Sequence, residues 1–134
     1  PIGSILVGSA DFIHKARRIR KVFGGGMRQA GYMAAAGNYA LTHHITRLET
    51  DHRHAKQLAN ALAKKDFVPS IMPVVTNLVI FEVGGRFTAA GLVEILQRYN
   101  IYCLTISPTQ VRLVTHLDIS AAMVNQVVSV IDAL

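Results

Sequence analysis

The chain has 134 residues, of which 51% are hydrophobic and 16% are charged. These proportions exclude an intrinsically disordered chain, and the charged fraction lies below the roughly 25% of ordinary soluble domains. We therefore expect the surplus apolar surface to pack against another chain or another part of the same protein. The single cysteine, Cys103, excludes an internal disulfide framework and a multi-cysteine zinc site, and it favours a reducing, cytoplasmic compartment.

The formal net charge of +6 is concentrated in the first half of the chain. Residues 1–65 contain 11 lysines and arginines against 3 acidic residues, whereas residues 66–134 contain 3 against 5. The basic half favours an anionic partner, such as a phosphate, a carboxylate or nucleic acid. We expect no membrane span and no signal peptide, because no uncharged apolar run approaches ~18 residues and residues 1–9 carry no positive charge.

The chain begins with a predicted strand and a predicted helix. Residues 2–7 form a short apolar run containing one glycine, which predicts a buried strand. Ser9 is a suitable N-cap for a helix over residues 10–23. The three glycines at 24–26 end this helix, because glycine is unfavourable inside one.

Two more helices are predicted before the composition changes at residue 66. Residues 27–41 are small and apolar, and Gly31 and Gly37 each cost about 1 kcal/mol relative to alanine inside a helix. We therefore expect another backbone to pack closely against this segment. Residues 42–65 predict a third helix, which could be continuous with the second. Its solvent-exposed side is expected to carry two i,i+4 ion pairs, Arg47–Asp51 and Glu49–Arg53.

The second half predicts a small α+β unit. Residues 74–83 are rich in β-branched side chains and predict a strand, and Thr88 caps a helix that ends near residue 98. Residues 101–106 and 111–115 predict an antiparallel hairpin, and Ser120 caps a final helix. The boundary between the two halves is expected somewhere along the third helix.

The glycine loop is the first candidate site. Lys21 precedes Gly24–Gly26 and Arg28 follows them, so a loop that opens a helix would present backbone N–H groups and two cations to a phosphate or carboxylate. The alternative is a tight turn between two helices with solvated cations, since glycine-rich patterns are weak signals by themselves.

Arg112 is the second candidate. The strand period places Arg112, Val114 and His116 on one face, and an arginine among β-branched residues needs a partner if it is buried. Its planar fork suits a carboxylate held by two parallel hydrogen bonds. The alternatives are a structural ion pair and an edge-strand arginine facing water. For His116 and Asp118, a local hydrogen bond is the favoured interpretation.

Histidines and the cysteine are weaker candidates. The four histidines near the third helix lack metal-ligand spacing, so we expect no metal site and interpret them as exposed helix residues. These are His43, His44, His52 and His54. Cys103 lies in an apolar segment without an adjacent base, which favours a buried, inert thiol over a nucleophile. The basic stretch 14–21 allows nucleic-acid binding, although no aromatic residue is interleaved with its cations.

Three segments together resemble the C-terminal part of low-specificity L-threonine aldolases. They are PIGSILVGS at 1–9, ARRIRKVFGGGMRQAGYMAAAGNYAL at 16–41 and VRLVTHLD at 111–118, in the family's order and spread over nearly the whole chain. The resemblance implies a pyridoxal-phosphate (PLP) lyase of the aspartate-aminotransferase-like fold. Such an enzyme is a cytoplasmic homotetramer that cleaves threonine or allo-threonine to glycine and acetaldehyde.

The resemblance also implies roles for three residues. Arg112 matches the arginine that binds the substrate carboxylate, and Lys21 and Arg28 match basic residues near the cofactor phosphate, partly in a neighbouring subunit's site. The lysine that links covalently to PLP would lie upstream of Pro1, so this chain contains no catalytic residue. The chain alone is therefore expected to be incomplete and inactive.

The expected fold is α/β with three parts. Residues 1–41 would be the end of a large PLP domain, 42–65 a long connecting helix and 66–134 a small α+β domain. The expected partners are an amino-acid substrate and further copies of the chain, with no nucleic acid and no membrane. The alternatives are another PLP lyase or hydroxymethyltransferase of this fold and, from a different class, an anion- or nucleic-acid-binding module.

Overall fold

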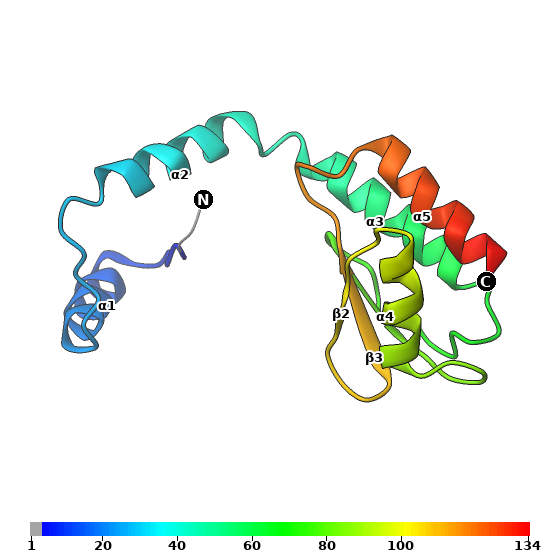
Figure 1. Cartoon of the computed structure of the whole chain (residues 1–134). Helices are drawn as coiled ribbons and strands as arrows, with labels where there is room; N and C mark the ends of the chain where they lie inside the picture. Colours follow the sequence, from blue (N-terminus) through cyan, green and yellow to red (C-terminus); the bar gives the residue numbers. More distant parts are fainter. Residues whose placement is uncertain (1–3) are drawn as a thin grey trace. The chain divides into compact units, whose positions relative to one another are not determined.

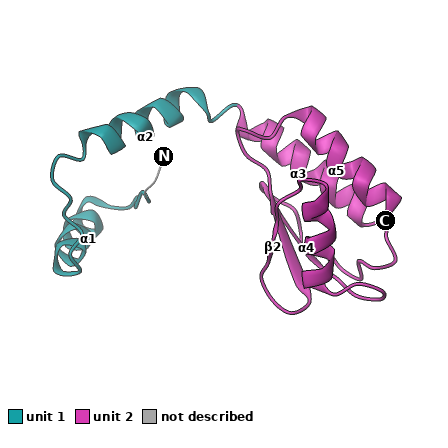
Figure 2. Cartoon of the chain, viewed as in Figure 1, with its two compact units in different colours: residues 1–46 teal, residues 47–134 magenta. Residues whose placement is uncertain are grey.

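The computed structural model describes residues 4–134 and divides the chain into two compact units. Unit 1 is Pro1–Thr46 and unit 2 is Arg47–Leu134 (Figure 2). The expected boundary between the two halves falls just before the third helix, at a turn. No helix within residues 4–134 has the length and apolarity needed to cross a membrane.

Unit 1 contains two helices, α1 (Ala10–Val22) and α2 (Gly31–His43). The Ser9 Oγ accepts a hydrogen bond from the Phe12 backbone N–H at 3.3 Å, which confirms the predicted N-cap. Neither helix has a buried residue. Residues 4–46 of unit 1 therefore form no core of their own, and their large apolar side chains remain exposed, which supports the expectation that this surface packs elsewhere. They include Val7, Phe12, Ile19, Phe23, Met27, Tyr32, Tyr39 and Leu41.

The strand predicted over residues 2–7 is not found in its described part. Residues 4–7 adopt neither helix nor strand, and residues 2 and 3 lie outside the described range. A strand needs a neighbour to satisfy its N–H and C=O groups, and no strand of residues 4–134 pairs with this segment.

The second and third helices are shorter than predicted and separate. Gln29 has a positive φ of 55°, and α2 begins only two residues later, at Gly31. The backbone from His44 to Arg47 forms turns, and α3 spans Leu48–Leu62. Its packing partners, β1 and α5, both belong to unit 2.

Unit 2 is built on a three-stranded antiparallel sheet (Figure 1). The strands are β1 (Leu78–Glu82), β2 (Leu104–Thr105) and β3 (Gln110–Val114), in the order β1-β3-β2. The short connection from β2 to β3 makes the predicted hairpin. β3, which was predicted over residues 111–115, lies in the middle of the sheet, paired on both sides.

Three helices share one core with one face of the sheet. Thr88 and Ser120 cap α4 (Ala89–Arg98) and α5 (Ala121–Ala133) by accepting backbone N–H hydrogen bonds at 3.1 and 3.2 Å, as predicted. The alternation of strand side chains sends every second residue into this core. Its members include Phe67, Val79, Phe81, Val111, Leu113, Leu58, Leu62, Leu92, Leu96, Val124 and Ile131.

Candidate functional site

Arg112 lies in the middle of the open face of the sheet. It is directly opposite Ile80 of β1 and Leu104 of β2, and its neighbours on β3, Val111 and Leu113, point into the core. The residue is half-buried, and its Nε is buried without a hydrogen-bond partner in the described part of the chain. Because buried N–H groups are nearly always paired, this atom is available to a ligand.

Both alternatives for Arg112 lose support in the structure. The strand that carries it is central, not at an edge. The nearest acidic side chain across the ladder, Glu82, accepts a hydrogen bond from the Gln110 side chain at 2.8 Å. Within residues 4–134, Arg112 forms no ion pair. The fork of Arg112 is therefore free to bind a carboxylate on this face.

The glycine loop ends α1, as predicted, and part of its backbone serves this helix end. Gly24 has a positive φ of 81°, its N–H donates to the Lys21 carbonyl at 3.1 Å, and the Gly25 N–H donates to the Arg20 carbonyl at 2.8 Å. These are the two bonds of a Schellman C-cap. Two of the three glycine N–H groups are thus already used, and α2 begins only five residues after Gly26.

The two predicted phosphate-binding cations flank this cap. Lys21 is exposed in the last turn of α1 and folds back over the loop, since a Cβ on Gly26 would lie 2.9 Å from its Nζ. Arg28 is exposed in the segment before α2. The N-cap of α2, Ala30, offers no side-chain hydrogen bond, so this helix start is uncapped. Two exposed cations beside an uncapped helix N-terminus fit an anionic group.

The Arg47–Asp51 ion pair forms as predicted, but Asp51 does not lie on an exposed side of the helix. The Arg47 Nη1 lies 2.9 and 2.8 Å from the two carboxylate oxygens of Asp51, but Asp51 is only 4% exposed. The segment after β3 covers this turn of α3, which helical periodicity alone cannot reveal. Glu49 and Arg53 form no ion pair among the described residues.

His54 and Cys103 differ in burial from what was predicted, whereas His43 is exposed as expected. His54 is 5% exposed, not solvated, because it shares the inward face of α3 with Asp51, Ala55 and Leu58. Within residues 4–134, no group of three His, Cys, Asp or Glu side chains lies close enough to hold a metal ion. Cys103 is half-buried, and burial raises the pKa of its thiol to about 11, which agrees with an inert thiol. The His116 Nδ1 accepts the Asp118 N–H at 3.3 Å, the predicted local bond.

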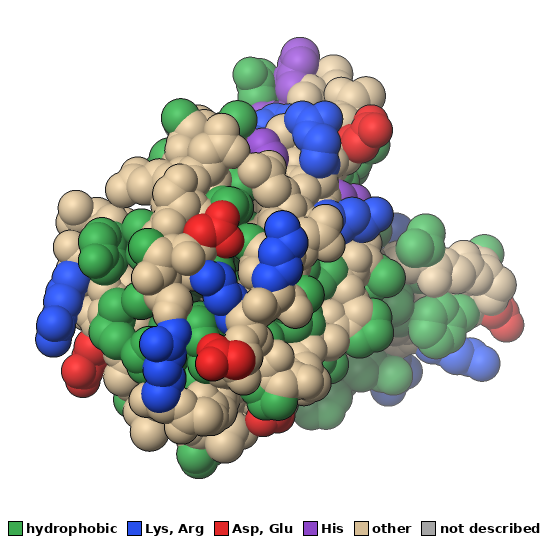
Figure 3. Space-filling model, turned by 90° about the vertical axis from the view of Figure 1, so that its right-hand side faces the viewer, with side chains coloured by type: hydrophobic (Ala, Val, Ile, Leu, Met, Phe, Trp, Pro, Cys, Tyr) green, Lys and Arg blue, Asp and Glu red, His purple; other side chains and the backbone are tan. Residues whose placement is uncertain are grey.

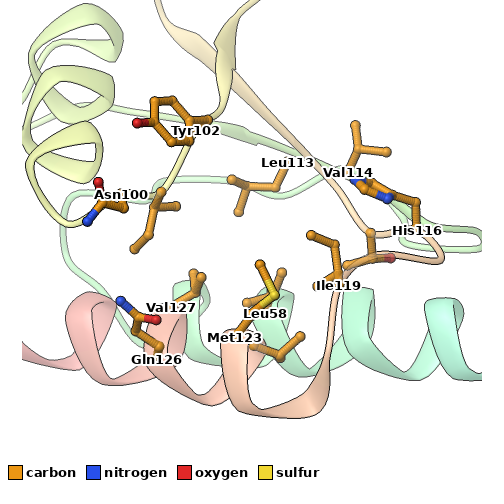
Figure 4. A pocket seen from close by; sticks show the side chains of 13 residues that line it. Leu58, Asn100, Tyr102, Leu113, Val114, His116, Ile119, Met123, Gln126 and Val127 are labelled. Atoms are coloured by element: carbon orange, nitrogen blue, oxygen red, sulfur yellow. The ribbon is translucent and has the colours of Figure 1, made fainter.

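A cavity of about 310 Å³ lies on the core side of unit 2 (Figure 4). Aliphatic side chains from α3, α5 and β3 form its walls, and Tyr102, Asn100 and His116 lie at its edges. None of the predicted site residues lines it. Val114 and His116, which follow Arg112 on β3 and in the segment after it, are among its lining residues, but Arg112 is not.

Comparison with known proteins identifies the family. Residues 1–85 match the model of the beta-eliminating lyases, and the chain belongs to this family. It is 43% identical over 127 residues to the low specificity L-threonine aldolase of Escherichia coli K12, a match that covers 95% of this chain and 37% of that protein. Low-specificity L-threonine aldolase 1 of Arabidopsis thaliana is 36% identical over 132 residues, covering 96% of this chain and 37% of that protein.

The fold has a counterpart among solved structures. The histidinol-phosphate aminotransferase of Clostridium acetobutylicum matches 60% of this chain with a TM-score of 0.50 and 13% identity, over 25% of its own length. This likeness confirms the predicted α/β class. The chain spans only about 37% of the length of the aldolases that it resembles.

Proposed function

We propose that the chain is the C-terminal part of a PLP-dependent aldolase that cleaves threonine or allo-threonine to glycine and acetaldehyde. The observation that carries this proposal is Arg112, whose Nε is buried without a partner in the described part of the chain, on a strand paired on both sides. The names of the two relatives supply the substrate class.

The role of Arg112 in this proposal is to bind the substrate's α-carboxylate. A guanidinium can hold a carboxylate through two parallel hydrogen bonds, which fix both its position and its plane. Two-point binding orients the substrate about its Cα and so selects which bond to that carbon breaks. A half-buried site strengthens this contact, because fewer water molecules compete for the carboxylate.

Lys21 and Arg28 are proposed to hold the cofactor's phosphate, or to brace the junction between two subunits near it. Both side chains are exposed cations in unit 1. PLP, when bound, stabilises the negative charge that develops at Cα as the Cα–Cβ bond breaks. The lysine that links covalently to PLP belongs, in this proposal, to the part of the relatives' length that this chain does not span.

The domain division, assembly and location complete the proposal. Residues 1–41 would complete a large domain, and residues 42–65 would lead into a small domain formed by residues 66–134 together with α3, which packs in the same core. The exposed apolar side chains of unit 1 support packing against the large domain and against other subunits of a homotetramer. A cytoplasmic location agrees with a single, half-buried cysteine.

Nucleic-acid or anion binding is the second candidate. Its support is the cation-rich surface of α1, which carries five exposed basic residues: Lys15, Arg17, Arg18, Arg20 and Lys21. On the face seen in Figure 3, lysine and arginine side chains are interspersed with aspartate and glutamate, so that face has no continuous basic patch. Binding to a generic oligonucleotide that weakens steeply with salt, and is lost when residues 15–21 are reversed in charge, would favour this candidate.

The experiment that tests the aldolase proposal uses a chimera. This chain replaces the matching segment of the Escherichia coli relative, and glycine and acetaldehyde are measured with L-threonine, L-allo-threonine and L-serine. We expect cleavage of both threonines, and a preference for another amino acid would favour a different PLP lyase. A chimera that folds and binds PLP but cleaves neither threonine would refute the proposal. The isolated chain mixed with PLP and threonine should release no acetaldehyde, because in this proposal it lacks the covalent lysine.

A further inference from the structure

A single arginine joins the start of α3 to the segment that follows β3. The Arg47 Nη1 binds both carboxylate oxygens of Asp51, and the Arg47 Nη2 donates to the carbonyl oxygens of His116 and Leu117 at 3.3 and 3.0 Å. In Figure 1 this segment passes from β3 to the beginning of α3 before it enters α5. We call Arg47, Asp51 and these two carbonyl groups the Arg47 clasp.

The end of β3 is held at a second point by Thr115. Its backbone N–H donates to the Asn77 carbonyl at 3.0 Å, and the Asn77 side chain donates back to the Thr115 carbonyl at 2.7 Å. The Thr115 hydroxyl donates to the Asp51 backbone oxygen at 2.7 Å. Three consecutive residues, 115 to 117, are therefore each bonded to another element, and the first of them lies three positions after Arg112.

The chemistry of the clasp requires arginine. The two Nη groups point at different partners, one at the Asp51 carboxylate and the other at two carbonyl groups, and the single ammonium of lysine cannot serve both. The Asp51 side chain is 6% exposed, so removing Arg47 would leave a buried carboxylate without its ion-pair partner, which costs far more than breaking a surface pair. Such a contact holds one arrangement of the segment after β3.

We propose that Arg47 is a positioning residue that fixes where Arg112 presents its guanidinium to the substrate carboxylate. A strand advances about 3.3 Å per residue, so the clasp anchors β3 within roughly 10–17 Å of Arg112 along the chain. The inference rests on the proposed role of Arg112. It adds a residue that touches neither substrate nor cofactor in that proposal but determines the geometry of the residue that binds the substrate.

The first experiment uses the isolated chain and does not depend on activity. Amide hydrogen exchange is measured for Arg47→Lys, with Arg53→Lys as the matched control on the exposed side of the same helix. The reporters are the Thr115 N–H and the Ile119 N–H, which donates to the His116 carbonyl at 2.9 Å. The Val83 N–H, bonded to the Thr109 carbonyl at 2.7 Å, reports the opposite end of the sheet.

We expect exchange of both reporters to accelerate at least tenfold in Arg47→Lys and less than twofold at Val83. Arg53→Lys should change none of the three amides. Equal acceleration at both ends of the sheet would mean global destabilisation and would overturn the positioning role. Unchanged exchange at Thr115 and Ile119 would show that the Arg47 clasp does not stabilise the segment after β3, and the proposal would be wrong.

The second experiment is a double-mutant cycle in the aldolase chimera. If Arg47 acts through Arg112, Arg47→Lys lowers kcat/KM about three- to tenfold, chiefly through KM, and lowers it no further when Arg112 is already alanine. Equal losses in both backgrounds would overturn the inference. If the unmutated chimera folds, binds PLP and is inactive, the proposed function has failed, and the exchange experiment alone decides whether the clasp positions β3.

Discussion

The Thr115 Oγ1 lies 2.7 Å from the backbone oxygen of Asp51, and this hydrogen bond joins the residue after β3 to the first turn of α3. Thr115 is 1% exposed because it continues the alternation that turns Val111 and Leu113 toward the helices. Its hydroxyl is thus the polar member of an otherwise aliphatic row.

Thr115→Val should therefore destabilise unit 2 although it keeps the shape of the side chain. Losing this buried hydrogen bond is expected to lower the free energy of unfolding by about 1–3 kcal/mol, and Thr115→Ser should lose less. Urea unfolding followed by circular dichroism measures this difference. Thr109→Val, in the exposed turn before β3, is the control. Equal stability of Thr115→Val and the unmutated chain would contradict the prediction.

Arg112→Lys should reduce kcat/KM of the aldolase chimera at least roughly tenfold, about 1.4 kcal/mol of transition-state stabilisation, because lysine keeps the charge but loses the two-point fork. Arg112→Ala should cost more, while PLP absorbance stays near normal. Arg98→Lys at the exposed end of α4 is the control. A structural role predicts the opposite pattern, in which thermal stability falls and the folded enzyme keeps its activity. Steady-state kinetics and thermal melts of the same variants separate the two.

Cys103 should react slowly with thiol reagents in the folded chain. Burial raises the pKa of its thiol from 9.0 to about 11, so at pH 8 the thiolate fraction, and with it the alkylation rate, should fall one to two orders of magnitude, roughly, below that of the urea-unfolded chain. The unfolded thiol also ionises first as pH rises. The contribution of Cys103 to stability is therefore complete below pH 9 and is lost as pH approaches 11. Equal alkylation rates in both states would contradict this.

Gly37→Ala should have opposite effects in the chain alone and in the aldolase chimera. Nothing lies within 4 Å of a Cβ built on Gly37, so alanine should raise the helicity of the isolated chain, being favoured by about 1 kcal/mol inside a helix. In the chimera the proposed close packing on α2 leaves no room for the methyl group, and the melting temperature should fall. Stabilisation in both settings would show that no backbone approaches this face.

The isolated chain should self-associate. Large apolar side chains of unit 1 are exposed, Tyr32 at 93% and Phe23 at 86%, and they lie on elements without a buried residue. Sedimentation velocity over a range of concentrations should detect species larger than the monomer. Charged substitutions at Tyr32 and Phe23 should reduce them, whereas the same change at Tyr102 of unit 2 serves as the control. A monomer at high concentration would contradict the prediction.

The elements of unit 2 could be predicted from the sequence because their signals are local. The caps Thr88 and Ser120 and the β-branched run of β3 act within a few residues, and each element appears where it was expected. The limits of the strands could not be predicted. Pairing across the sheet decides them, and β2 pairs over only two residues.

The candidate site could be predicted only in part, for a similar reason. Periodicity placed Arg112 on a strand face, but its central position depends on the strand order, which no local pattern encodes. Helical periodicity also predicted an exposed Asp51. This was wrong because the segment that covers Asp51 lies more than 60 positions further along the chain. The burial of Thr115 could have been read from its alternation with Val111 and Leu113. The glycine loop was predicted both to end the preceding helix and to expose N–H groups; the structure confirms the helix end, which uses the N–H groups of Gly24 and Gly25.

The absence of buried residues in α1 and α2 has a consequence for how these helices tolerate substitutions. In unit 2, a change such as Phe81→Ala leaves a void among the chain's own side chains, and the chain itself registers the loss. In unit 1, α1 and α2 have no buried residue to disturb. Harmful substitutions along these two helices should therefore occur at the positions that contact the surface covering them, and their pattern should map that interface.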